Sequence, residues 1–117
     1  MNNKIIYTGP DADYPKGHYV GAISVTKVRN AMKKIGYELV NASNNRCNNV
    51  LEGSSGFVKH PDGRLVYFSC DHSCVTPPCL YRTAENDRDY HGGPNNFCSD
   101  LPSLCDGVRS LFERCKW

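Results

Sequence analysis

Seven cysteines occur in this chain of 117 residues, and three of them lie in one short run, Cys70-Asp-His72-Ser-Cys74-Val-Thr-Pro-Pro-Cys79. Thiolate and imidazole groups are the ligands that Zn²⁺ prefers in structural sites, which are tetrahedral. The spacing of Cys70 and Cys74 suits one ligand pair, and Cys79 or Cys98 would complete the set. The pattern therefore predicts a candidate zinc site built from Cys70, His72, Cys74, Cys79 and Cys98.

The sequence leaves two other states of these thiols open, namely a disulfide within the run or from it to Cys98, and free thiols. The metal pattern is incomplete, because strong zinc motifs contain two tight ligand pairs and this chain has one run. A catalytic redox role is disfavoured, because no Cys-x-x-Cys stands at a helix N-terminus, where the pKa of a thiol would fall. Since seven is an odd number, at least one thiol is unpaired within a monomer.

Residues 1–10 contain one lysine and only two consecutive aliphatic residues. A secretory signal requires an apolar stretch of about 7–15 residues, and a membrane span requires about 20. Neither pattern occurs, so we expect a soluble, cytoplasmic protein with no membrane partner and with reduced thiols. The net charge of +2 is too small to imply a polyanionic partner by itself, so such a partner would have to be recognised by a local cluster of cations.

A cationic cluster of this kind lies on a predicted helix over residues 24–35, with Ser24 as its N-cap and Gly36 after its last turn. Apolar residues recur at helical spacing on one side, and the other side carries cations and no acidic residue. We call Lys27, Arg29, Lys33 and Lys34 the basic face. It is either a solvated surface or a docking surface for phosphates or an acidic protein. No aromatic residues interleave with these cations, which disfavours single-stranded nucleic acid.

The densest polar segment lies between residues 82 and 96, and its candidate binding residues are Arg82, Asp89, Tyr90, His91 and Asn95. Loops of this composition commonly carry binding or catalysis. His91 with Asp87 or Asp89 would make a general base and its orienting carboxylate. The alternative is a surface loop whose Asp and Asn side chains form local turn hydrogen bonds. No nucleophile motif and no phosphate-binding glycine loop accompanies the segment, so evidence for an enzyme is slight.

The elements that must position these residues follow from hydrophobic spacing and turn residues. Strand formers on both sides of a Pro-Asp-Gly triplet predict a β-hairpin over residues 56–70, and shorter strands are expected at 4–8, 37–42 and 80–83. A second amphipathic helix follows a cap at Ser99 or Asp100, and Cys105 and Cys115 fall on its apolar side. Polar pairs and a Gly-Ser-Ser-Gly stretch make residues 43–55 a predicted loop, in which Cys47 has no local partner.

The length and the ordinary hydrophobic content of 39% fit a single domain over residues 1–117. The order helix, strands, helix predicts an α+β fold: a small, mainly antiparallel sheet built around the hairpin, with the two amphipathic helices packed on one face.

Three functions remain open on the sequence. The leading hypothesis is a small non-enzymatic intracellular binding protein that masks a larger protein or nucleoprotein partner, of the kind that phages and other mobile elements encode as inhibitors. It rests on small size, long polar loops, the basic face and the lack of a catalytic signature. The alternatives are a zinc-stabilised module that binds nucleic acid or protein, and a small hydrolase or nuclease centred on His91. Nucleic acid and an acidic protein are alternative partners, because both would be recognised by the same cations.

Overall fold

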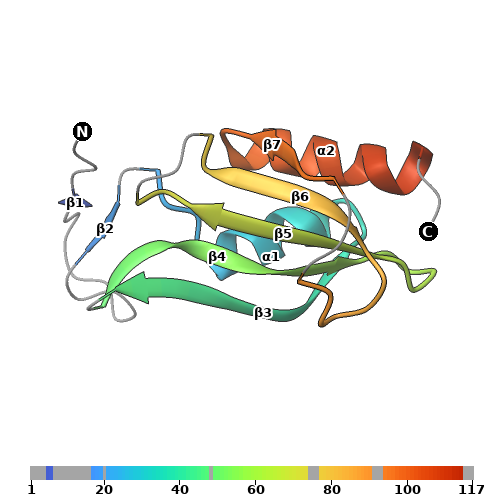
Figure 1. Cartoon of the computed structure of the whole chain (residues 1–117), viewed down its shortest axis with the longest axis horizontal. Coiled ribbons are helices and arrows are strands. Elements are labelled where there is room, and N and C mark those ends of the chain that lie inside the picture. The colour runs from blue at the N-terminus through green and yellow to red at the C-terminus, as the bar shows by residue number, and fades with distance from the viewer. Residues whose placement is uncertain are drawn as a thin grey trace.

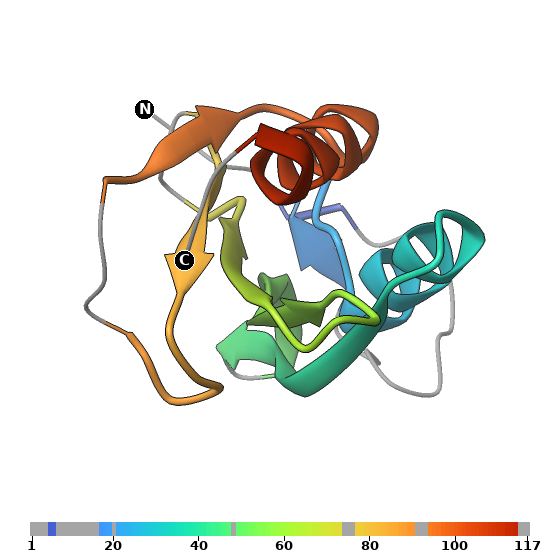
Figure 2. The same cartoon turned by 90° about the vertical axis from the view of Figure 1, so that its right-hand side faces the viewer.

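In the part of the chain that the structure describes, seven strands form one sheet, and both helices pack on the same face of it (Figures 1 and 2). The computed structural model describes residues 5–6, 17–19, 21–47, 49–73, 77–90 and 94–114. In chain order the elements are β1 (Ile5–Ile6), β2 (His18–Tyr19), α1 (Val25–Lys34), β3 (Glu38–Cys47), β4 (Val50–Lys59), β5 (Leu65–Asp71), β6 (Cys79–Ala84), β7 (Asn96–Cys98) and α2 (Leu101–Arg114). The predicted α+β class is confirmed.

The sheet is built outward from the predicted hairpin, which is β4 and β5. The strand order is β1-β2-β4-β5-β6-β7, with β3 paired to β4. Every pairing is antiparallel except that of β2 with β4, which joins His18 to Leu51. In Figure 2, α1 and α2 lie on one side of the curved sheet, and residues 85–90, which follow β6, lie on the other. The sheet is therefore mainly antiparallel, as predicted, and no helix of the described residues lies on its second face.

The first helix begins where its sequence predicts. The Ser24 hydroxyl accepts a hydrogen bond from the Lys27 N–H at 3.2 Å, and Asn44 of β3 caps the Val25 N–H at 2.8 Å. These two caps satisfy backbone donors that a helix N-terminus otherwise leaves unpaired. Gly36 ends the helix with φ 93°, a left-handed conformation that glycine adopts without steric cost.

The predicted loop over residues 43–55 is wrong, because these residues complete β3 and begin β4. The two glycines of the stretch serve close packing. A Cβ at Gly53 would collide with the Cys70 carbonyl, and one at Gly56 would collide with Ala42. Between them Ser54 is fully buried, and its hydroxyl donates to the Ile23 carbonyl at 2.9 Å. Small residues are thus needed here because neighbouring backbone approaches on both sides.

The core lies between the sheet and the two helices. Val58, Val66 and Phe68 of the sheet meet apolar residues of the helices, and the buried helical members are Val28, Met32, Leu104, Val108 and Phe112. The cap of α2 is Asp100, whose carboxylate accepts from the Ser103 N–H at 2.9 Å. Cys105 lies half-buried against this core, and Cys115 lies outside the described residues. Among the described residues, neither helix combines the length and apolar character needed to cross a membrane.

Candidate functional site

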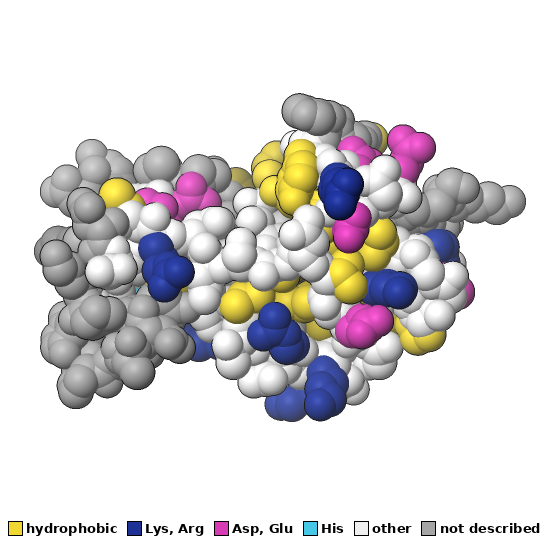
Figure 3. All heavy atoms as spheres, turned by 90° about the horizontal axis from the view of Figure 1, so that it is seen from below, with side chains coloured by type: hydrophobic (Ala, Val, Ile, Leu, Met, Phe, Trp, Pro, Cys, Tyr) yellow, Lys and Arg dark blue, Asp and Glu magenta, His cyan; other side chains and the backbone are white. Residues whose placement is uncertain are grey.

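The basic face stands out from the fold as an exposed, positively charged strip. Its four side chains are all exposed, while Val25, Val28 and Met32 on the opposite side of α1 are buried. Within the described part of the chain, no salt bridge joins any of the four cations to an acid. Figure 3 views the molecule from the β3 side, where Lys and Arg side chains spread along the lower half and Asp and Glu lie mostly in the upper half.

The helix dipole of α1 affects the cations at its two ends differently. Lys33 and Lys34 are in the last turn, where the helix dipole favours cations. Lys27 is in the first turn, which contains no acidic residue, and there the dipole favours an anion. Lys27 is therefore placed unfavourably with respect to the helix dipole.

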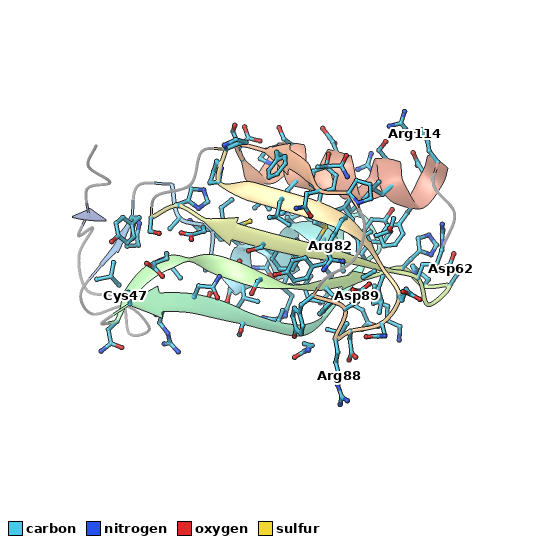
Figure 4. The ribbon with its side chains drawn as sticks, in the orientation of Figure 1. Cys47, Asp62, Arg82, Arg88, Asp89 and Arg114 are labelled. Atoms are coloured by element: carbon cyan, nitrogen blue, oxygen red, sulfur yellow. The ribbon has the colours of Figure 1, made fainter. Side chains whose placement is uncertain are left out.

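The second candidate region, the polar segment after β6, is held to the sheet by Arg82 (Figure 4). This side chain is only 3% exposed. Its guanidinium donates to the Asp89 carbonyl at 2.6 Å and the Thr83 carbonyl at 3.2 Å, and lies 3.7 Å from the Asp89 carboxylate. It also stacks over the Tyr67 ring at 4.7 Å. All the donors and the charge of Arg82 thus face the protein rather than solvent.

Tyr90 attaches this segment to the face of the sheet opposite the two helices, which we call the helix-free face. Its ring packs edge-on against Phe57 and Tyr67, with centroid distances of 5.5 and 5.8 Å. Its hydroxyl accepts from the Asn41 amide at 3.0 Å, and the same amide donates to the Asp87 carbonyl at 2.7 Å. Phe57 is fully buried beneath this cover, although neither of the two described helices lies on that face.

The polar segment also makes the local turn hydrogen bonds that the sequence predicts as the alternative to catalysis. The Asp89 carboxylate accepts from the Glu85 N–H at 3.0 Å, and the Asn86 side chain accepts from the Arg88 N–H at 2.8 Å. Asn95 is exposed, and His91 lies outside the described residues. Asp89, one of the two carboxylates predicted to orient His91, is therefore already engaged by Arg82 and by a backbone N–H, and the general-base pair of His91 with Asp87 or Asp89 stays a prediction.

Three of the candidate metal ligands form a row across the sheet on its helix-covered side. Cys70 of β5 is directly opposite Cys79 of β6, and Cys79 is directly opposite Cys98 of β7. Because directly opposite residues of an antiparallel pair point to the same side, the three side chains share one face of the sheet. We call Cys70, Cys79 and Cys98 the thiol row.

Electrostatics distinguish the members of the thiol row. Hydrogen bonds from Cys70 and Cys98 lower the pKa of Cys79. The hydrogen bond to Cys79, together with burial, raises the pKa of Cys70. Burial and the neighbouring Cys79 raise the pKa of Cys98 to about 12. Cys70 and Cys79 are fully buried, whereas Cys98 is partly exposed.

The described members of the predicted zinc set do not form a metal centre. Among the residues that the structure describes, no group of three His, Cys, Asp or Glu side chains could hold a metal ion. The His72 ring is not part of the thiol row. Its Cδ2 atom lies 3.6 Å from the position that a Cβ atom at Gly21 would occupy. Burial lowers the pKa of His72. Cys74 lies outside the described residues. The cysteines that are described carry free thiols, including Cys47 at the far end of β3 (Figure 4).

Sequence reasoning missed three residues that shape the helix-free face, namely Asn41, Phe57 and Tyr67. Asn41 has φ 48° at an irregularity of β3, and an asparagine within a strand is the one local signal for such a position. Searches for similar proteins give no further guide, because no family model, no curated protein and no solved structure matches this chain.

Proposed function

We propose that this chain is a small non-enzymatic intracellular binding protein whose basic face docks on an acidic surface of a larger protein or nucleoprotein partner and masks it. Inhibitors of this kind are encoded by phages and other mobile elements. The supporting observation is a strip of four exposed cations that form no salt bridge within the described residues, on a helix fixed to the core by its other side. A fixed array of unpaired charge steers association with a surface of opposite sign.

The dimensions of the strip indicate what it would cover. From Lys27 to Lys34 the helix rises about 10 Å, at 1.5 Å per residue. Four cations over this distance match a compact acidic patch on a protein, or a few phosphates of a duplex. The two partners differ in salt dependence. If each cation neutralised one phosphate of duplex DNA, the logarithm of the association constant would fall with the logarithm of salt with a slope of about −3.6.

The test reverses the four charges together by replacing Lys27, Arg29, Lys33 and Lys34 with Glu. A matched control replaces four exposed arginines outside α1 with Glu, namely Arg46, Arg88, Arg109 and Arg114. Both variants change the net charge from +2 to −6, since four positive charges become four negative ones. Only the position of the changed charge differs between them, so a net-charge effect and a surface-specific effect are separated.

Binding of labelled poly-glutamate and of a duplex DNA is measured by fluorescence anisotropy at several salt concentrations. We expect the basic-face variant to lose on the order of 100-fold in affinity, and the control to lose about tenfold or less, because charges outside the contact act only at long range. Circular dichroism confirms that both variants fold. Equal losses in the two variants, or no binding of either probe by the wild type, would refute the assignment of this surface.

A further inference from the structure

The thiol row places three cysteines on three adjacent strands at one level of the sheet. Residues directly opposite each other in an antiparallel pair have Cα atoms about 4.5–5.5 Å apart, and their side chains share a face. Disulfides form at Cα separations of about 4.4–6.8 Å. Both pairs of the row, Cys70 with Cys79 and Cys79 with Cys98, meet this requirement through their register. Cys70 and Cys79 also belong to one buried core cluster, against which Cys98 packs, so the three thiols lie on the same side of the sheet.

We propose that the thiol row is a relay for disulfide exchange, which accepts a disulfide from a low-molecular-mass donor such as oxidised glutathione at Cys98 and passes it inward through Cys79 to Cys70. The exposure of the members supports this direction, and the raised pKa of Cys98 and of Cys70 makes both of their attacks slow near neutral pH, so exchange accelerates as the pH rises. Cys98 is the partly exposed member, and Cys70 and Cys79 are fully buried. Cys79 can bond only one neighbour at a time, so the two protein disulfides are alternatives.

The relay consists of three exchange steps. The Cys98 sulfur attacks oxidised glutathione, a mixed disulfide forms, and one glutathione leaves as a thiol with the proton of Cys98. The Cys79 sulfur then attacks Cys98, the bond to glutathione breaks, and the second glutathione leaves with the proton of Cys79. Finally the Cys70 sulfur attacks Cys79, the bond between Cys79 and Cys98 breaks, and Cys98 regains a proton from Cys70. In total, oxidised glutathione is reduced to two thiols and one protein disulfide forms.

The first protein disulfide would act on the polar segment, because Cys98 ends the short strand to which that segment leads. β7 contains three residues and is the last strand on its side of the sheet. A bond between Cys79 and Cys98 ties this strand covalently to β6 and closes the chain around the segment that covers Phe57. The second disulfide releases β7 again and fixes β5 to β6 instead. The relay therefore has one state that adds a covalent tie across the segment and one that does not.

The experiment treats the reduced full-length protein with oxidised glutathione, blocks remaining thiols with N-ethylmaleimide at intervals, and maps disulfides by mass spectrometry after Asp-N digestion. Cleavage before Asp71, Asp89 and Asp100 puts the three members of the row on separate peptides. Cys74 shares a peptide with Cys79, and fragmentation of that peptide distinguishes the two. Two variants isolate the steps: Cys70→Ala removes the last acceptor, and Cys98→Ser removes the entry point. Cys105→Ser, a half-buried thiol of α2, is the matched control.

In the wild type, we expect the Cys79–Cys98 linkage first and the Cys70–Cys79 linkage later. Cys70→Ala should stop at Cys79–Cys98, with a melting temperature raised by on the order of 10 °C over its reduced form. Cys98→Ser should slow oxidation of Cys79 by about tenfold or more, because a buried thiol is poorly accessible, and Cys105→Ser should behave as wild type. A principal linkage to Cys74 or Cys115, or unchanged oxidation of Cys79 in Cys98→Ser, would overturn the relay.

Discussion

Replacing Arg82 with Ala tests whether the polar segment is held to the sheet by this one side chain. Arg82 makes two hydrogen bonds to carbonyls and stacks on Tyr67. Hydrogen bonds from a charged donor contribute about 1.5–3 kcal/mol each, and a cation–π contact about 1 kcal/mol or more. The sum of about 4–7 kcal/mol is offset in part, because the substitution also removes the cost of burying a charge and water can reach the freed Asp89 carbonyl. We expect a net loss of about 3 kcal/mol in the free energy of unfolding.

The assay is urea denaturation followed by circular dichroism, with amide hydrogen exchange measured over residues 85–90. Arg88→Ala is the control, because this arginine belongs to the same segment and is exposed, with its side chain pointing away from the sheet (Figure 4). The control should stay within about 0.5 kcal/mol of wild type. Exchange over residues 85–90 should accelerate in Arg82→Ala and not in the control. An Arg82→Ala protein as stable and as protected as the control would refute the role of Arg82 in holding the polar segment to the sheet.

Three further predictions concern individual side chains. Ser54→Ala should cost about 1–3 kcal/mol of unfolding free energy, because it leaves the Ile23 carbonyl without its buried donor, whereas Ser55→Ala next to it should cost under about 0.5 kcal/mol by urea denaturation. Burial lowers the pKa of His72, so the unfolded chain binds the proton first as the pH falls below about 6.5. Stability should therefore decrease from that pH down to the lower folded pKa, and His72→Gln should flatten this part of a melting-temperature profile; an unchanged profile would contradict the shift. Lys27→Glu should raise the free energy of unfolding by about 1 kcal/mol, because it supplies the acidic residue that the first turn of α1 lacks.

Helices and hairpins were predictable here because their signals are local. The caps Ser24 and Asp100 and the apolar spacing of both helices lie within a few residues of what they determine. The segment 43–55 was not predictable, because its glycines and serines have the composition of a loop. Small residues are required there because the backbones of β3 and β5, which are distant in the local sequence pattern, approach β4 closely in the folded sheet. Local spacing grouped Cys70, Cys79 and Cys98 along the chain, and the register of three strands places these thiols in one row.

The polar segment was difficult for a related reason. Composition marks it as a candidate site, but composition does not show whether its charges face solvent or protein. Arg82 and Asp89 face each other, and Tyr90 reaches Asn41, a residue 49 positions earlier in the chain. Contacts at such separation depend on the whole sheet and leave no local pattern. The basic face is the opposite case, because helical periodicity alone determines that its four cations share a side that the core does not use.

Lys27 gives a way to separate the two interpretations of the basic face with one substitution. If the strip is a solvated surface, Lys27→Glu changes only the helix terminus, so stability rises and polyanion binding is weak and unaltered. If the strip docks on an acidic partner, stability rises by the same amount while affinity falls, since the substitution places a negative charge within the contact. Opposite signs for the two quantities would show that an unfavourable residue in the first turn is retained for binding, as is common at functional sites. A gain in stability without a loss of affinity would assign the cations to solvation.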